Sequence, residues 1–197
     1  MLSYFGLYCA FIASVWIVVG VYTAGKLYPG YSHTKQFCSE LGAAGSPTEK
    51  LSPIINNYPL GLLFCLFGWY VLQLDNTPVL ITLVGFLVII HGVSTWVAGY
   101  YPMDAEPQTK TPTLSCQIHS WAGLVMLLSL LIAPVLVAAS SYASISFRLF
   151  SILCVGIIGY LVLLLASAFK QQANAGLYQR LAYSVQLLWL SAFSLVI

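Results

Sequence analysis

Six long stretches of this chain are nearly free of charged side chains, and they constrain its fold more than any other feature. None has Asp, Glu or Lys in its central part, and they cover about residues 2–24, 59–74, 78–101, 116–139, 147–169 and 181–197. About 20 apolar residues in a helix cross the hydrocarbon core of a bilayer. The stretches lack the alternation of barrel strands, so only helices satisfy the backbone in lipid. We predict an all-α, polytopic membrane bundle of six transmembrane helices, forming one domain over residues 1–197.

The composition excludes most other classes of protein. Hydrophobic residues make up 60% of the chain and charged residues 6%, and the mean hydropathy is +0.90. A soluble domain carries about 25% charged residues. A soluble enzyme, a nucleic-acid binder and a disordered protein are therefore excluded. The expected partner is the lipid bilayer, and no nucleic acid is expected.

The first connection, over residues 25–58, is long and rich in turn-forming residues. Its glycines suit positions with a positive φ angle, so the loop can fold back over the mouth of the bundle as a lid or re-entrant cap. Alternatively, Gly42, Gly45 and Pro47 end a short interfacial helix over about residues 32–41. The second span can begin inside this loop near Ser52, with Pro53 in its first turn.

Basic residues collect at one end of the predicted bundle, which we call the loop-rich end. It carries the loops after the first, third and fifth spans, with six basic residues against Arg148 alone at the other end: Lys26, Lys35, Lys50, Lys110, Lys170 and Arg180. Basic loops remain in the cytoplasm. We therefore expect a cell (inner) membrane protein with a cytoplasmic loop-rich end and both termini outside. Alternatively, the N-terminus lies in the cytoplasm, and the insertion of a helical hairpin overrides the count of basic residues.

Most potentially reactive side chains also lie at the loop-rich end. They are His33, Ser39, Glu40, Glu49, Asp104, Glu106 and His119, with His91 about 15 Å deeper along the third span. Ionisable groups within a span are costly, and they face water or the interior of the bundle. The pattern predicts a polar pocket that opens at the loop-rich end.

Asp104 and His119 are the sharpest candidate pair. They flank the short connection between the third and fourth spans, so they can approach one another. An Asp–His contact would make His119 a general base or a metal ligand. Alternatively, Asp104 and an N-cap at Ser115 close the entrance of the fourth helix. The small polar neighbours of His91 favour an interhelical histidine over a ligand. With Glu40 as a second acid or base, the candidate catalytic residues are His119, Asp104, Glu40 and His33.

Several short motifs together resemble one known family. They are Tyr-Pro-Gly-Tyr-Ser-His at 28–33, Ser-Glu-Leu-Gly at 39–42 with Ser-Pro at 46–47, Tyr-Pro-Met-Asp at 101–104, His119 with Gly123, and Gly-Leu-Tyr-Gln-Arg at 176–180. In these the chain resembles the prokaryotic six-span membrane protein family known only as domain of unknown function 998. The resemblance covers essentially the whole chain. It implies an integral membrane protein and brings no established activity.

A looser likeness is to the intramembrane hydrolases that include alkaline ceramidases and adiponectin-receptor-like proteins. Those enzymes hold zinc with three histidines, near a Ser and an Asp. The partial counterparts in this chain are Ser94, His91, Asp104 and His119. The chain has six predicted spans instead of seven and lacks a late His-x-x-x-His pair. A zinc ion would therefore need His33, His91 and His119 together.

Three functions remain open on these residues. The first is an intramembrane enzyme acting on a lipid or other amphiphile with the four candidate catalytic residues. The second is a transporter for a small solute or a proton, although the other end adds little buried charge to a path. The third is a non-catalytic membrane scaffold or sensor whose polar residues bond to one another.

Overall fold

The chain folds almost entirely into helices. The computed structural model describes residues 2–197, with side chains from Phe5 onward. Its long helices are α1 (Leu2–Leu27), α2 (Tyr58–Leu72), α3 (Val79–Tyr100), α4 (Leu114–Ala139), α5 (Ile145–Lys170) and α6 (Ala175–Ser194). Two short ones are the 3₁₀ helix η1 (Cys38–Gly42) and the π-helix η2 (Pro53–Asn57). The described range holds no strand, so the all-α prediction is confirmed.

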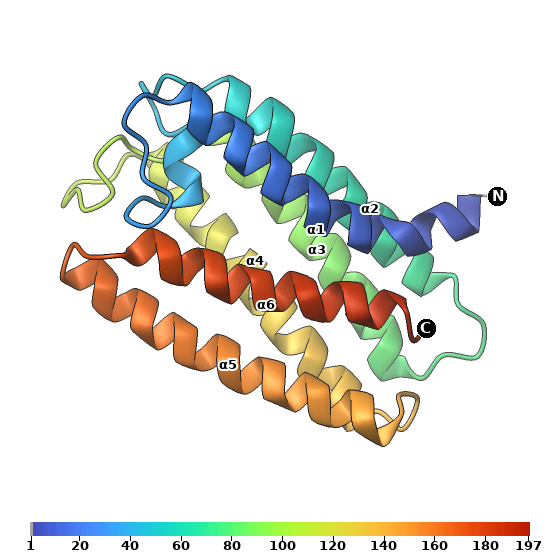
Figure 1. Cartoon of the computed structure of the whole chain (residues 1–197). Coiled ribbons are helices and arrows are strands. Elements are labelled where there is room, and N and C mark those ends of the chain that lie inside the picture. Colours follow the sequence, from blue (N-terminus) through green and yellow to red (C-terminus); the bar gives the residue numbers. More distant parts are fainter. Residues whose placement is uncertain (1) are drawn as a thin grey trace.

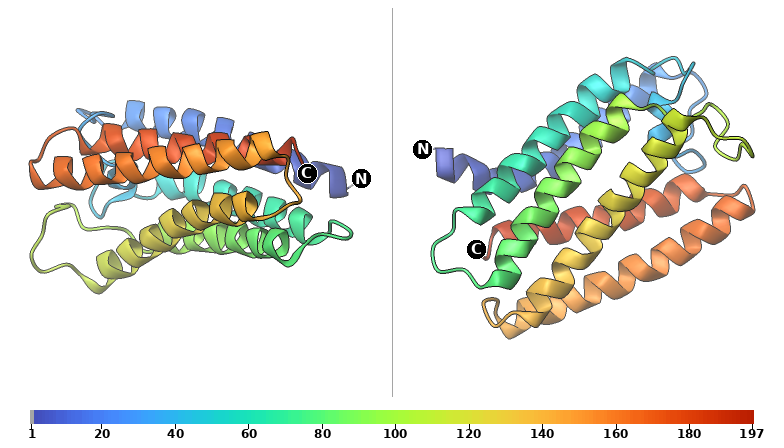
Figure 2. Two further views of the ribbon diagram at one scale, coloured as in Figure 1. Left: turned by 90° about the horizontal axis from the view of Figure 1, so that it is seen from below. Right: turned by 180° about the vertical axis from the view of Figure 1, so that it is seen from behind.

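The long helices run antiparallel to their neighbours and form two layers (Figures 1 and 2). One layer contains α1, α6 and α5, and the other contains α2, α3 and α4. Both chain ends lie at one end of the bundle, together with the short turns at 73–78 and 140–144. The loops at 28–50 and 101–113 lie at the opposite end. The predicted division into a loop-rich end and an end with both termini is therefore confirmed.

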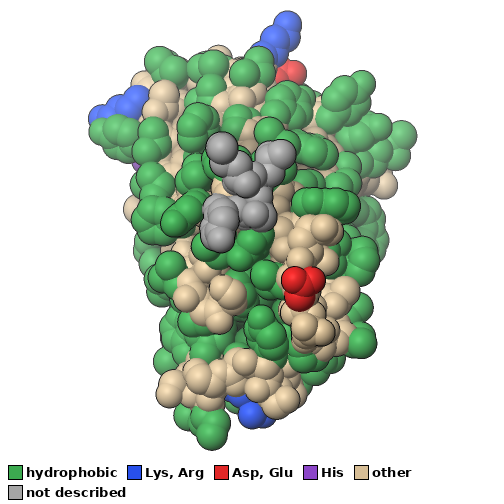
Figure 3. Space-filling model, turned by 90° about the vertical axis from the view of Figure 1, so that its right-hand side faces the viewer, with side chains coloured by type: hydrophobic (Ala, Val, Ile, Leu, Met, Phe, Trp, Pro, Cys, Tyr) green, Lys and Arg blue, Asp and Glu red, His purple; other side chains and the backbone are tan. Residues whose placement is uncertain are grey.

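Five helices are long and apolar enough to cross a membrane. These segments are Phe5–Leu27, Pro53–Leu72, Val79–Tyr100, Leu114–Ala139 and Ile145–Lys170. Large apolar side chains point outward from them, for example Val18 (68% exposed) and Leu163 (70% exposed). Figure 3 looks onto the end with the termini, where hydrophobic and uncharged side chains predominate. The outward-facing apolar side chains along these helices are stable against acyl chains and not against water. The chain is a helical membrane bundle.

Helix α6 is the exception among the six long helices. Its 20 residues are long enough to cross the hydrocarbon core. It is less apolar than the others because Gln179, Tyr183 and Gln186 repeat along one helical face. The amide nitrogen of Gln186, itself 1% exposed, donates to the Leu127 carbonyl of α4 at 3.0 Å, so this face points into the bundle. A sixth crossing by α6 stays a prediction.

Close backbone contact and an aromatic core hold the layers. A Cβ placed on Gly92 of α3 would lie 2.6 Å from the carbonyl oxygen of Gly61 in α2, so these helices pack closely through small residues. Trp189 and Phe193 of α6 stack at 5.3 Å between ring centroids within the buried core. The indole N–H of Trp189 donates to the Ser151 hydroxyl of α5 at 2.9 Å, which satisfies a buried donor.

The second helix begins in the first loop, as predicted. Helical geometry starts at Leu51, with Pro53 in the first turn, and the π-helix η2 continues into α2. The wider π turn displaces backbone carbonyls from the usual ladder. Side chains of neighbouring helices bond two of them: Trp16 of α1 donates to Ile55 O at 2.7 Å, and Trp96 of α3 donates to Tyr58 O at 2.9 Å.

Candidate functional site

The first loop folds over the loop-rich end, and we call residues 28–50 the cap. It is anchored to the start of α6. The backbone N–H groups of Gly176 and Leu177 donate to the carbonyls of Lys35 (3.2 Å) and Thr34 (2.8 Å). The first N–H groups of a helix lack the usual i−4 partner. The loop bonds both, although Leu177 shares its N–H with the Asn174 carbonyl at 3.2 Å. The cap contains the 3₁₀ helix η1, which ends at Gly42, and no α-helix over 32–41, so the interfacial-helix alternative holds only for its last turn.

Arg180 and Gln179 of α6 add side-chain contacts to this anchor. Arg180 donates to the Gln36 carbonyl at 2.7 Å and to the Tyr31 hydroxyl at 2.5 Å. The Gln179 side chain accepts from the Cys38 backbone N–H at 2.8 Å. Cys38 and Cys116 are both free thiols. Burial raises the pKa of the Cys38 thiol, and the nearby Arg180 offsets this only in part.

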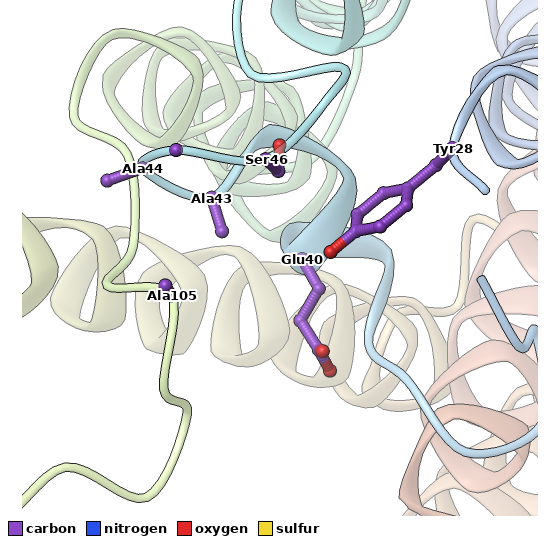
Figure 4. A pocket seen from close by; sticks show the side chains of 7 residues that line it. Tyr28, Glu40, Ala43, Ala44, Ser46 and Ala105 are labelled. Carbon is purple, nitrogen blue, oxygen red and sulfur yellow. The ribbon is translucent and has the colours of Figure 1, made fainter. Parts of the chain in front are cut away.

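Glu40 stabilises the turn that carries it. Its carboxylate accepts from the Phe37 backbone N–H at 2.7 Å and from the Gln36 amide at 3.0 Å. It lines a cavity of about 70 Å³ together with Tyr28, Ala43, Ala44, Gly45, Ser46 and Ala105 (Figure 4). The cavity has room for only a few water molecules. The sequence predicted a polar pocket at this end, and this small one contains Glu40 but not His33, Asp104 or His119.

Asp104 stabilises the N-terminus of α4. Its two carboxylate oxygens accept from the backbone N–H (2.9 Å) and the hydroxyl (2.6 Å) of Thr113. Thr113 is the N-cap of α4, and its hydroxyl accepts from the Cys116 N–H. The hydrogen bonds from Thr113 hold the pKa of Asp104 below its ordinary value. The N-cap predicted at Ser115 is wrong, because Ser115 lies inside the helix and donates to the Pro102 carbonyl.

His119 caps the end of α3 instead of meeting Asp104. Its Nδ1 lies 2.9 Å from the Ala98 carbonyl oxygen and 2.8 Å from that of Tyr101. Both partners can only accept, so Nδ1 carries the proton and Nε2 carries the lone pair. The structure therefore gives no Asp104–His119 hydrogen bond. The side chain is half-buried.

His33 lies against the end of α1. Its ring stacks on Tyr22 (centroids 6.4 Å apart, 12°) and meets Tyr31 edge-on at 5.1 Å. A Cβ on Gly25 would lie 2.7 Å from two ring atoms of His33, so the glycine makes room for the ring. Burial lowers the pKa of His33, and the nearby Arg180 and Lys26 lower it further.

His91 is fully buried and bonded on both ring nitrogens. Nδ1 lies 3.0 Å from the Met126 carbonyl oxygen and 3.1 Å from the Ser129 hydroxyl, both in α4. Nε2 lies 3.0 Å from the Tyr183 hydroxyl in α6. It is an interhelical histidine, the interpretation that the sequence favoured. His33, His91 and His119 do not gather, and the described residues contain no group of three His, Cys, Asp or Glu that could hold a metal ion. These histidines do not fit the zinc site considered from the sequence.

The sequence analysis missed the polar face of α6. Gln179 and Arg180 entered only as part of the motif at 176–180 and, for Arg180, as a basic residue of the loop-rich end, and Tyr183 was not singled out. Their signal was available: polar residues at 179, 183 and 186 follow the i, i+4, i+7 spacing of one helical face. The partners of that face in the cap and in α3 could not be inferred without the fold.

The fold and these contacts define a class of protein: a helical membrane bundle with an ordered polar cap at one end. The family model described as "Protein of unknown function (DUF998)" matches residues 11–196, nearly the entire chain. The chain belongs to this family. No curated protein and no solved structure matches it significantly.

Proposed function

We propose that this protein is a membrane sensor or scaffold whose cap is coupled to the interior of the bundle. The observation that carries the proposal is the polar face of α6. Gln179 binds the cap at Cys38, and one turn further Tyr183 binds His91 in α3. His91 in turn contacts α4 through Met126. A ligand that moves the cap therefore also acts on α6, and α6 is bonded to the buried His91.

The construction of the cap suits such a role. Its buried side chains are few, namely Leu41, Ala43 and Thr48. The cap is held by hydrogen bonds to α6 and by one from the Ala44 N–H to the Met103 carbonyl at 2.9 Å, at the bundle end where water competes for them. The only apolar cluster there is small, namely Ala43, Met103 and Cys116, among the described residues. Segments with little buried apolar surface open at low free-energy cost, and regulatory elements are commonly of this kind. The cap can therefore move while the helices stay packed.

Hydrogen–deuterium exchange on the full chain in lipid nanodiscs tests the coupling. Tyr183→Phe removes only the hydroxyl that bonds His91, and Tyr178→Phe is the matched control because its hydroxyl makes no hydrogen bond among the described residues. We expect faster exchange at Cys38, Gly176 and Leu177 in Tyr183→Phe and wild-type rates in Tyr178→Phe. Equal rates in both variants would overturn the proposal.

A second candidate function is an intramembrane enzyme acting on a lipid or other amphiphile. His119 favours it, because the carbonyls of Ala98 and Tyr101 fix the tautomer in which Nε2 can accept a proton. In this role His119 is the base, while Asp104, Glu40 and His33 complete the proposed polar site. Cells producing wild-type or His119→Gln protein are compared by lipid mass spectrometry. A lipid change present only with the wild type supports the enzyme, and identical profiles contradict it.

A further inference from the structure

We propose that Lys26, His33 and Arg180 form a binding site for the phosphate of an anionic phospholipid headgroup. The inference rests on the proposed role of the cap as a sensing element, and it names the ligand. The three residues come from the end of α1, the cap and the start of α6. A phosphate held among them would join the three segments.

His33 contacts two tyrosine rings, and each of these rings also contacts one of the two basic side chains. Lys26 Nζ lies 5.4 Å from the centroid of Tyr22, on which His33 also stacks. The Arg180 guanidinium carbon lies 5.7 Å from the centroid of Tyr31, whose ring meets His33 edge-on. Cation–π contacts of this kind hold basic side chains in place without neutralising them.

The positive charge of the cluster is not balanced by a carboxylate. Among the described residues, no acidic side chain pairs with Lys26 or Arg180, and the buried Nε of Arg180 has no hydrogen-bond partner. The carboxylate of the cap, Glu40, is already bonded to Phe37 and Gln36. Arg180 and Lys26 also lower the pKa of His33, which places both charges near its ring. An anion among the three would relieve this repulsion and pair the charges.

The position of the cluster favours a phosphate that belongs to a lipid. Lys26 lies in the last turn of α1 and is exposed, and Tyr22, one turn earlier, is 57% exposed. The end of a membrane-spanning helix lies at the depth of the headgroups, where aromatic and basic residues anchor. Basic side chains at this depth recognise anionic lipids. A lipid of the surrounding leaflet therefore has its headgroup at the depth of the site.

Native mass spectrometry of the full chain in detergent tests the site. Phosphatidylglycerol, phosphatidylcholine and inorganic phosphate are titrated separately against wild type, Lys26→Gln and the control Lys110→Gln. Lys110 is an exposed lysine at the same end but outside the cluster. Lys26 is chosen over Arg180 because Arg180 also anchors the cap.

We expect wild type to prefer phosphatidylglycerol and Lys26→Gln to lose about fivefold in that affinity, the ratio for about 1 kcal/mol per basic residue. Lys110→Gln keeps the wild-type affinity.

A titration of pH supplies a second measurement. The charged and titratable groups that face His33 are Tyr22 and Lys26 of α1, Tyr31 of the cap and Arg180 of α6. Among them only His33 has an ordinary pKa near neutrality, and burial together with Arg180 and Lys26 lowers it. As the pH falls from about 7.5 through the lowered pKa of His33, the affinity for phosphatidylglycerol should rise in wild type and stay constant in His33→Gln.

Three results would overturn the site: equal affinity for phosphatidylglycerol and phosphatidylcholine, equal losses in Lys26→Gln and Lys110→Gln, or inorganic phosphate binding as tightly as the lipid. The last result would assign the cluster to a soluble anion. None of them changes the exchange rates that test the coupling of the cap to His91. Failure of the lipid site is therefore distinguishable from failure of the proposed function.

Discussion

The hydroxyl of Tyr183 lies 3.0 Å from Nε2 of His91, and the two rings stack with centroids 5.9 Å apart. Nδ1 of His91 faces the Met126 carbonyl, which can only accept, so Nδ1 carries the proton. Nε2 therefore accepts from Tyr183. This one contact joins α6 to the buried centre of α3 and, through His91, to α4.

Loss of that hydroxyl should destabilise the bundle. Tyr183→Phe leaves Nε2 of His91 buried without a donor, so we expect a loss of about 1 kcal/mol in the free energy of unfolding. Thermal unfolding of the purified protein in detergent measures the change. Tyr178→Phe should melt with the wild type, and a Tyr183→Phe protein as stable as that control would contradict the prediction.

The link between Asp104 and Thr113 predicts a pH dependence of stability. The folded state lowers the pKa of Asp104, so its stabilising effect is present above the ordinary carboxyl pKa and is lost as the pH falls through the lowered value. The wild-type melting temperature should therefore fall below about pH 4. Asp104→Asn has no carboxylate to protonate, so its melting temperature should fall less at low pH. At pH 7 it should be less stable than the wild type.

Melting curves of both proteins across pH 3 to 7 provide the comparison. Thr113→Ala removes the N-cap hydroxyl and is expected to cost about 1 kcal/mol. If Asp104→Asn shows the full wild-type pH dependence, the contact with Thr113 does not contribute to stability.

The close approach of α2 and α3 makes Gly92 intolerant of a side chain. In Gly92→Ala the new Cβ would meet the Gly61 carbonyl at 2.6 Å and Cys65 Sγ at 2.7 Å, both on α2. We expect a loss of about 1–3 kcal/mol, the usual cost of overpacking. Gly156→Ala is the matched control, because no atom of another helix lies within 4 Å of its Cβ position. Equal melting temperatures for the two variants would refute the close packing.

The charge distribution predicts the orientation in the membrane. Six of the seven basic residues lie at the loop-rich end, so that end should be cytoplasmic and both termini outside. In bacteria, a C-terminal alkaline phosphatase fusion should be active, and the same fusion after Lys110 should be inactive. The reverse pattern would show that a helical hairpin near the N-terminus sets the orientation.

The helices and their order followed from the sequence because they depend on local composition. An apolar run predicts a helix in lipid wherever it lies, and Pro53 in a first turn predicts where the second helix begins. The candidate site was less predictable. Asp104 and His119 are fifteen positions apart at one bundle end, but Asp104 bonds Thr113 at the start of α4 and His119 bonds carbonyls at the end of α3. Spacing along the chain brings residues to the same end and leaves the direction of their side chains undetermined.

By itself, the sequence determined an all-helical membrane bundle, the shared end of its two termini and the gathering of polar residues at the opposite end. Hydrophobicity and charge decide these features residue by residue. The tertiary structure alone decided that Arg180 anchors the cap, that Tyr183 reaches His91 and that His33 contacts the two tyrosine rings on which Lys26 and Arg180 lie. Such contacts join residues up to 149 positions apart, and they arise from the packing of α1, α3 and α6, which no local pattern encodes.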